Sequence, residues 1–170
     1  DSVQNEFEQI GSDKVFINPA GSATSTSAQK LTQEDLEAVR SAQAVEEADG
    51  VIFATTTAQF NDQQEFVTVL GTPTYQSQEL IQESWALEVE DGREVQSTDT
   101  SNVVIGSRVA KRLFEDEIGL RNTLTVNGED FRVVGVYKAT GDPSIDQAVV
   151  MPYPVAANLV DRDEETYDWI

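Results

Sequence analysis

The side chains able to do chemistry in this chain are carboxylates, hydroxyls, lysines and arginines, because it contains no cysteine and no histidine. That absence excludes thiolate nucleophiles, disulfides, Cys/His zinc sites and imidazole bases. Clustered carboxylates offer oxygen ligands for a hard cation. Two such clusters are Glu115, Asp116 and Glu117, and Asp161, Asp163, Glu164 and Glu165. Neither has the spacing of a calcium loop, so we interpret both as solvated surface and expect no metal site.

A second candidate is Gly106-Ser107, which follows a short apolar run as the serine of a nucleophile elbow follows its strand. The pattern G-x-S-x-G is absent, however, and no histidine is available as a base. We therefore interpret Ser107 as a helix N-cap. Glycine-rich phosphate-binding patterns are also missing. The sequence predicts no catalytic residue, no cofactor and no enzyme activity.

The densest basic group comprises Arg108, Lys111 and Arg112. Such a group can recruit an acidic partner. The carboxylates at 115–117 follow at helical spacing, however, so the preferred interpretation is an exposed network of charge pairs within one helix.

The charge balance constrains partners. The chain has 170 residues, with 11 basic against 31 acidic side chains and a net charge of −20. Nucleic acids and anionic lipid surfaces are bound largely through Lys and Arg, so neither is an expected partner. Acidic residues spread over the whole chain indicate halophilic adaptation, with an ordinary acidic domain as the alternative. The chain starts at Asp1 and its only methionine is Met151, so we expect a processed product or an excised piece of a longer protein.

The first half predicts a strand at 13–18, a solvated loop at 20–29, a helix and a hairpin. The helix, 32–42, has Thr32 as N-cap, Asp35 as its reciprocal acceptor, and Leu31 packing on Leu36. The β-branched runs 51–60 and 65–70 flank Asn61-Asp62, a pair typical of a tight turn.

The second half predicts a buried strand at 103–105, a helix from Ser107, and a hairpin of 123–126 with 131–137 around Asn127-Gly128. A strand at 148–151 and a helical turn opened by Pro154 follow. The fold class is α+β. The longest apolar runs, such as 51–54, are far shorter than the roughly 18 residues of a membrane span.

The second half contains an ordered series of short motifs: Asp91-Gly92-Arg93, Asp99, the run Val103 to Phe114, Gly119, Leu124, Val126, Gly128, the run Phe131 to Val136, and Val149 to Pro152. This series resembles the extracytoplasmic core domain of MacB-type ABC transporter permeases, the MacB/FtsX-like family. Upstream, Leu31 to Leu36 with Val45-Glu46, and Gly71 to Tyr75, are similar to further segments of that family. The resemblance covers about Gly11 to Val160, although Gln43-Ala44 replaces the usual Pro-Gly.

The resemblance implies a two-lobed α+β domain. Residues 1–80 would supply the first half of a βαβ-type membrane-proximal lobe, 81–155 an inserted β-rich lobe with one helix, and 156–170 the start of the return segment. The domain would lie on the extracytoplasmic face of the cell membrane. Hydrophobic helices would flank the chain in its parent protein.

The resemblance implies transmission of ATP-driven motion to export or extract a substrate, with hydrolysis on a separate ATPase subunit or domain. Its partners would be a second permease protomer, a cytoplasmic ABC ATPase reached through the membrane part, and an extracytoplasmic adaptor or substrate protein. The alternative is a stand-alone secreted module that binds a small ligand or cation through its acidic clusters. A hydrolase that uses carboxylates is the third interpretation.

Overall fold

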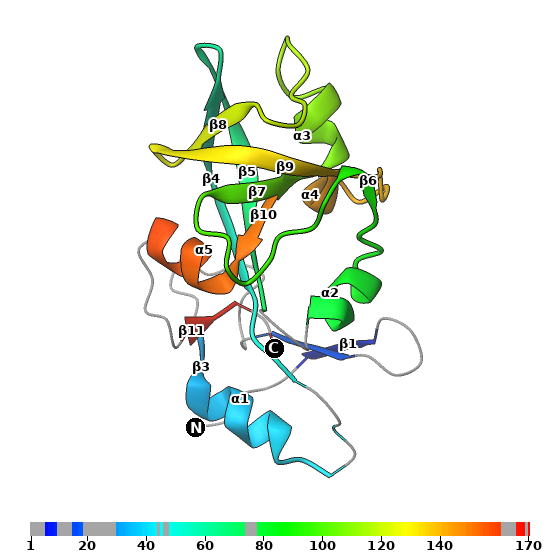
Figure 1. The fold of residues 1–170 in the computed structure, drawn as a ribbon. Helices are drawn as coiled ribbons and strands as arrows, with labels where there is room; N and C mark the ends of the chain where they lie inside the picture. The colour runs from blue at the N-terminus through cyan, green and yellow to red at the C-terminus, as the bar shows by residue number, and fades with distance from the viewer. Residues whose placement is uncertain are drawn as a thin grey trace.

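The computed structural model describes residues 6–9, 15–18, 30–43, 45, 48–73, 78–160, 166–168 and 170. Strands dominate this part of the chain, which gives the mixed α+β fold that the sequence predicts (Figure 1). The strands are β1 (Glu6–Gln9), β2 (Val15–Asn18), β3 (Leu31–Thr32), β4 (Ile52–Phe60), β5 (Gln63–Thr72), β6 (Val89–Gly92), β7 (Asn102–Ile105), β8 (Thr123–Val126), β9 (Glu129–Tyr137), β10 (Ala148–Pro152) and β11 (Thr166–Tyr167). The helices are α1 (Gln33–Arg40), α2 (Gln78–Ser84), α3 (Ser107–Lys111), α4 (Pro143–Asp146) and α5 (Tyr153–Leu159).

Seven strands form one sheet in the order β6-β9-β7-β10-β5-β4-β8. Strand β8 also pairs with β9, so six of these strands close into a ring and β6 lies outside it, against β9. Closure removes free sheet edges, which would otherwise attract other chains. The β10–β5 and β7–β9 pairs are parallel, and the other pairs of this sheet are antiparallel.

Alternation along the strands buries both faces of the sheet. Val103 and Ile105 belong to one buried cluster, to which all six ring strands contribute and which α3 and α5 also join. Val104 belongs to a second cluster, which includes Ile81 of α2, Trp85, and Ile145 of α4. Short apolar strands of this kind need no polar face, because helices cover the second side.

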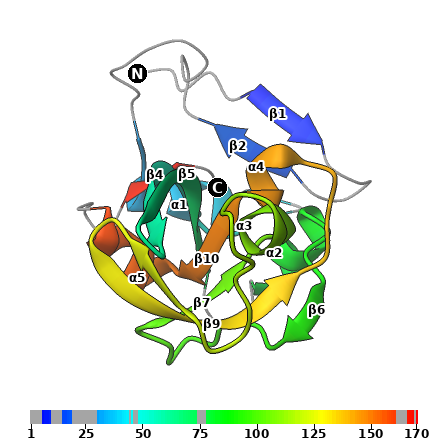
Figure 2. The same cartoon turned by 90° about the horizontal axis from the view of Figure 1, so that it is seen from above.

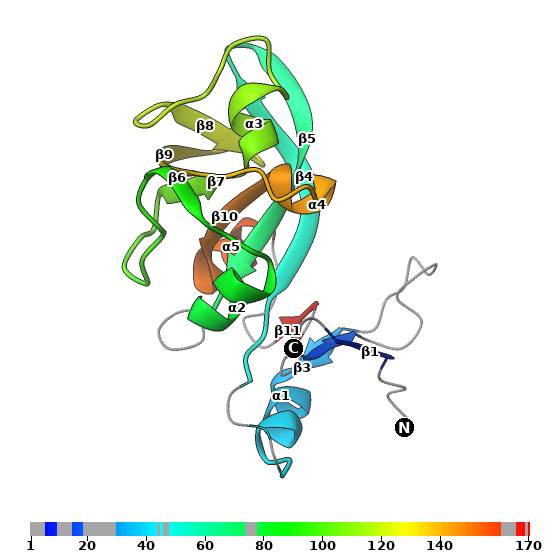
Figure 3. The ribbon, with the colours of Figure 1, turned by 90° about the vertical axis from the view of Figure 1, so that its right-hand side faces the viewer.

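A third buried cluster, the base cluster, lies apart from the sheet. Its members are Ile17, Leu31, Leu36, Ala48, Tyr167 and Ile170. Figure 3 shows α1, β3 and β11 at one end of the molecule, from which the β4–β5 hairpin rises to the other end. In Figure 2 the antiparallel pair β1–β2 lies at the edge of the molecule.

The sheet combines strands from both sides of residue 80. Strand β5 pairs with β10, and β4 pairs with β8. The hydrogen-bonded sheet crosses the first boundary proposed from the resemblance. The division into lobes stays a prediction. No helix in the described part of the chain is long and apolar enough to cross a membrane.

Three local predictions are confirmed. Thr32 caps α1 in a capping box: its hydroxyl accepts the Asp35 backbone N–H, and its own backbone N–H donates to the Asp35 carboxylate. The β4–β5 hairpin turns at Asn61-Asp62, both with positive φ. The β8–β9 hairpin turns at Asn127-Gly128, with φ of 48° and 83°.

Two predictions about α3 are wrong. The N-cap is Gly106, and no side chain caps the helix, so Ser107 is its first residue. A side chain at Gly106 would meet the Asp146 carbonyl oxygen 2.3 Å from its Cβ, which explains the glycine. The helix ends at Lys111, so the carboxylates at 115–117 do not follow at helical spacing, and Lys111 pairs with Glu90 at 2.6 Å instead.

Candidate functional site

Strand β9 changes its pairing partner from β8 to β6 along one edge, and a cluster of arginines lies at this change. On one edge, β9 pairs with β8 as far as Arg132 and with β6 from Gly135 onward. Between these two pairings, the carbonyl groups of β9 accept hydrogen bonds from residues outside β8 and β6. Arg121 donates its N–H to the Val133 carbonyl at 2.8 Å, and Arg93 donates to the Val134 carbonyl at 2.9 Å. Three arginines from different segments are thereby brought together.

These arginines line a cleft of about 320 Å³, here called the arginine cleft. Its polar lining consists of Arg93, Asn102, Arg121 and Arg132. Its apolar lining consists of Leu120, Val133 and Val134. The described lining contains no carboxylate.

The end of β6 packs tightly against the backbone of β9 at the point where β9 changes its partner from β8 to β6. Gly92 has a φ of +80°, and a Cβ there would lie 2.2 Å from the Val134 carbonyl oxygen. A Cβ on Gly135 would lie 2.2 Å from the Arg93 carbonyl oxygen. The ladder between β7 and β9 shifts register here, with Val103 opposite Val133 and Val104 opposite Gly135. Val134 is thus the extra residue of a β-bulge, a device that bends a strand and redirects side chains.

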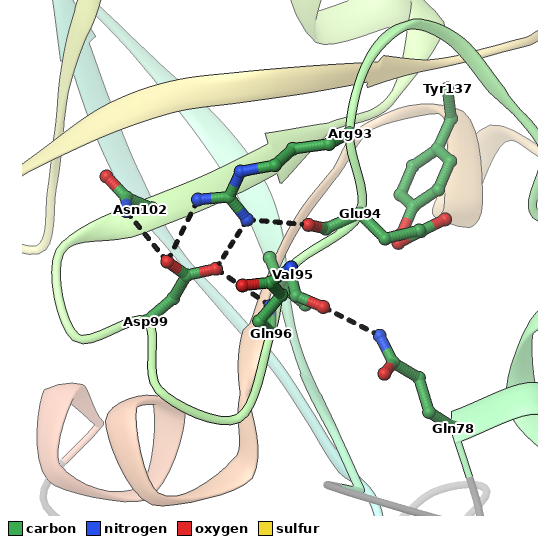
Figure 4. Close-up of polar contacts among 8 residues, drawn as sticks. All are labelled: Gln78, Arg93, Glu94, Val95, Gln96, Asp99, Asn102 and Tyr137. Atoms are coloured by element: carbon green, nitrogen blue, oxygen red, sulfur yellow. Dashed lines mark hydrogen bonds and ion pairs between the residues drawn. The ribbon is translucent and has the colours of Figure 1, made fainter.

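Asp99 fixes the position of Arg93 beneath the cleft (Figure 4). Its carboxylate accepts two hydrogen bonds from the Arg93 guanidinium, at 2.8 and 3.0 Å. It also accepts the Gln96 backbone N–H at 2.7 Å and the Asn102 side-chain amide at 2.8 Å. Two neighbouring residues of the cleft, Arg93 and Asn102, are therefore held by one carboxylate, which is 7% exposed.

Hydrogen bonding sets the ionisation of this pair. The bonds from Arg93 lower the pKa of Asp99 from 3.8 to about 2, assisted by Asn102 and the Gln96 N–H and opposed by burial. The same pairing raises the pKa of Arg93 above its ordinary value. Both groups are therefore charged throughout the physiological pH range.

A second, partly buried pair lies beside the first. The Tyr137 hydroxyl donates to the Glu94 carboxylate at 2.5 Å (Figure 4). Burial raises the pKa of Glu94 above its ordinary value, although the bonds from Tyr137 and Gln82 lower it in part. Burial also raises the pKa of Tyr137 well above 10.

Arg121 and Arg132 differ from Arg93 in lacking a counter-charge. Both side chains are exposed, and among the residues that the structure describes neither forms an ion pair or a side-chain hydrogen bond. Arg121 adopts a φ of 71°, a conformation uncommon for a residue with a side chain. The cleft can thus present two uncompensated guanidinium groups to an anion.

The residues singled out from the sequence do not form a site in the described structure. Glu115, Asp116 and Glu117 are exposed, and Asp116 accepts the Asn61 side-chain amide at 3.1 Å. Over the described ranges, no group of three acidic side chains is arranged to hold a metal ion. The cluster 161–165 lies outside the described residues. Arg108 and Arg112 are exposed on and beside α3 and do not line the cleft.

Sequence reasoning missed the arginine cleft. The motif series contains Asp91-Gly92-Arg93 followed by Asp99. In the structure Asp91 and Gly92 end strand β6 against β9, and Arg93 forms an ion pair with Asp99. No spacing links these residues to Arg121 and Arg132, because the link is the partner change along β9. The available signal was the sign of the charge alone, since arginine is scarce in so acidic a chain.

Comparison with known proteins gives one family. The family of MacB-like periplasmic core domains matches residues 1–168. An uncharacterized ABC transporter permease of Methanocaldococcus jannaschii is 23% identical over 168 residues, which are 99% of this chain and 42% of that protein. The chain thus spans less than half the length of this curated relative.

Among the solved structures that share the fold, two illustrate the likeness. The periplasmic region of MacB from Actinobacillus actinomycetemcomitans matches with a TM-score of 0.69 and 20% identity, over 94% of this chain and 73% of that one. The extracellular domain of the noncanonic ABC-type transporter YknZ from Gram-positive bacteria matches with a TM-score of 0.64 and 17% identity, over 82% and 71%.

Proposed function

Because the chain belongs to the family of MacB-like periplasmic core domains, the extracytoplasmic domains of ABC transporter permeases, we propose that it transmits ATP-driven motion to a substrate outside the membrane. The match over residues 1–168 carries the proposal, since it covers nearly the whole chain. The domain itself does no chemistry. Its partners are a second permease protomer, a cytoplasmic ABC ATPase, and an extracytoplasmic adaptor or substrate protein.

Transmission requires a firm connection between the base cluster and the sheet, and several contacts supply it. Asp168 is 8% exposed, accepts the Phe53 N–H of β4 at 2.9 Å and forms an ion pair with Lys30. The rings of Tyr153 in α5 and Tyr167 in β11 lie with centroids 5.3 Å apart. The buried Asp168 carboxylate therefore holds the start of β4 where this strand leaves the base cluster. Helix α5 contacts both the base cluster and the core of the sheet.

The Lys30–Asp168 pair provides a test in the full-length permease reconstituted with its ATPase in lipid. We expect K30A to lower the substrate moved per ATP hydrolysed, because the base would shift without carrying the sheet with it. ATP hydrolysis itself should continue. K138A is the matched control, since it removes one lysine and its ion pair with Glu88 from an exposed site on the sheet.

Equal coupling in K30A and K138A would contradict transmission through this junction. The alternative function, a secreted binding module, predicts a different result during purification of the native protein. The protein would then be recovered from the medium and would not be bound to an ATPase.

A further inference from the structure

The arginine cleft is a local reversal of charge. The chain carries a net charge of −20 and has only seven arginines. Three of them line this one cleft, and the described lining has no carboxylate. On so acidic a protein, the surrounding field repels anions, so a positive cleft is selective for an anion that its guanidinium groups contact directly.

The charge balance inside the cleft indicates the valence of that anion. Asp99 neutralises Arg93 and accepts two hydrogen bonds from its guanidinium group. Arg121 and Arg132 have no counter-ion among the described residues, so about two positive charges remain. A carboxylate supplies one negative charge, whereas a phosphate monoester supplies about 1.5 to 2 at neutral pH. Guanidinium forks also bind phosphate oxygens in pairs.

The size and apolar part of the cleft indicate what carries the phosphate. A volume of about 320 Å³ is at the small end of ligand pockets. Leu120 and Val134 are half-buried at its wall, beside the buried Val133. This wall suits a short organic group attached to the phosphate.

We propose that the arginine cleft binds the phosphate group of a small organophosphate, whether free in solution or at the headgroup of a lipid. Arg121 and Arg132 contact the phosphate, while Arg93 and Asn102, held by Asp99, orient it. The inference concerns this chain alone and does not rest on the transport function proposed above. Its failure would leave that function standing.

The test is a titration of the isotope-labelled chain, followed by the backbone amide signals of residues 93, 121 and 132–134. The probes are inorganic phosphate and glycerol 3-phosphate, each exchanged against chloride at constant ionic strength. We expect saturable shifts confined to these residues, with glycerol 3-phosphate binding more tightly than inorganic phosphate. Acetate under the same conditions should bind about tenfold more weakly, because it carries half the charge.

Two double variants with the same change of charge separate a site from a general field effect. R121Q/R132Q should weaken binding of glycerol 3-phosphate at least about tenfold. R108Q/R112Q, which removes two exposed arginines outside the cleft, should leave binding within about twofold. Dispersed amide spectra establish that both variants fold, and R132Q alone serves if the double variant does not.

Vesicles distinguish the sources of the phosphate. Sedimentation with vesicles of phosphatidic acid and phosphatidylcholine, lost in R121Q/R132Q but not in R108Q/R112Q, would assign the cleft to a lipid headgroup. Binding of glycerol 3-phosphate without sedimentation would assign it to a soluble organophosphate. Either result supports the proposal. Non-saturating shifts, equal weakening in both double variants, or acetate binding as tightly as phosphate would overturn it.

Discussion

Asp99 joins the two ends of the segment between β6 and β7. Its carboxylate accepts hydrogen bonds from Arg93 on one side and from Asn102 on the other, and it is nearly fully buried. Its pKa is lowered to about 2 from 3.8, chiefly by Arg93. That difference corresponds to about 2 kcal/mol. The stabilisation is complete above pH 3.8 and is lost as the pH falls toward 2.

We therefore expect D99N to lower the free energy of unfolding by about 1 to 3 kcal/mol at pH 7, because an amide cannot accept both guanidinium bonds. Urea unfolding at fixed salt measures this change. E129Q removes one charge from an exposed residue of β9 and is the control, with an expected change within about 0.5 kcal/mol. A D99N value equal to that of E129Q would contradict the structural role of this carboxylate.

Glu94 has the opposite pH dependence. Because burial raises its pKa in the folded state, folding is favoured below its ordinary value of 4.5 and this contribution is lost as pH rises through the folded-state value. E94Q keeps an acceptor for the Tyr137 hydroxyl and removes the partly buried charge. We expect E94Q to be as stable as the parent at pH 7, or more so, and to lose part of the fall in stability between pH 4 and 7. A destabilised E94Q with an unchanged pH profile would refute this assignment.

At the scale of elements, two glycines with nearly the same positive φ separate conformational strain from packing. Gly92 in β6 and Gly128 in the β8–β9 turn have φ of +80° and +83°. A Cβ at Gly92 would lie 2.2 Å from the Val134 carbonyl oxygen, whereas a Cβ at Gly128 would have nothing within 4 Å. G128A should cost about 1 kcal/mol from the left-handed conformation alone.

G92A should cost at least about 2 kcal/mol more than G128A, because β6 must also move away from β9. Thermal or urea unfolding of both variants gives the comparison. Equal losses would mean that β6 does not pack on the Val134 bulge as described.

Elements that depend on neighbouring residues could be predicted from the sequence, whereas those that depend on distant pairings could not. The capping box at Thr32 and the turns at Asn61-Asp62 and Asn127-Gly128 were predictable, because each depends on residues at most three positions apart. Closure of the ring was not, since it depends on β8 pairing with both β4 and β9. The arginine cleft was not predictable either, because it depends on β6, far away in the sequence, pairing with β9 next to the β8–β9 hairpin. Ser107 was misassigned because the close approach of Asp146 to Gly106 cannot be seen in local sequence.

At the scale of the whole molecule, a net charge of −20 on 170 residues repels itself in the compact state. Salt shortens the range of that repulsion, from about 10 Å at 0.1 M to about 3 Å at 1 M. We expect the melting temperature to rise from low salt to molar KCl, with NaCl giving a similar rise at equal ionic strength. A melting temperature independent of salt would exclude halophilic adaptation as the reason for the acidic composition.

The central claim is that this domain moves when ATP binds on the other side of the membrane. These 170 residues contain no cysteine, so E129C at the exposed start of β9 gives one label per protomer once any cysteine in the rest of the permease is replaced by serine. The measurement is the distance between the two spin labels in the full-length permease dimer with its ATPase, without nucleotide and with ATP trapped before hydrolysis. We predict a shift of the whole distance distribution on ATP binding, which K30A reduces and K138A does not. One identical distribution in both nucleotide states, in a complex that still moves its substrate, would contradict the account.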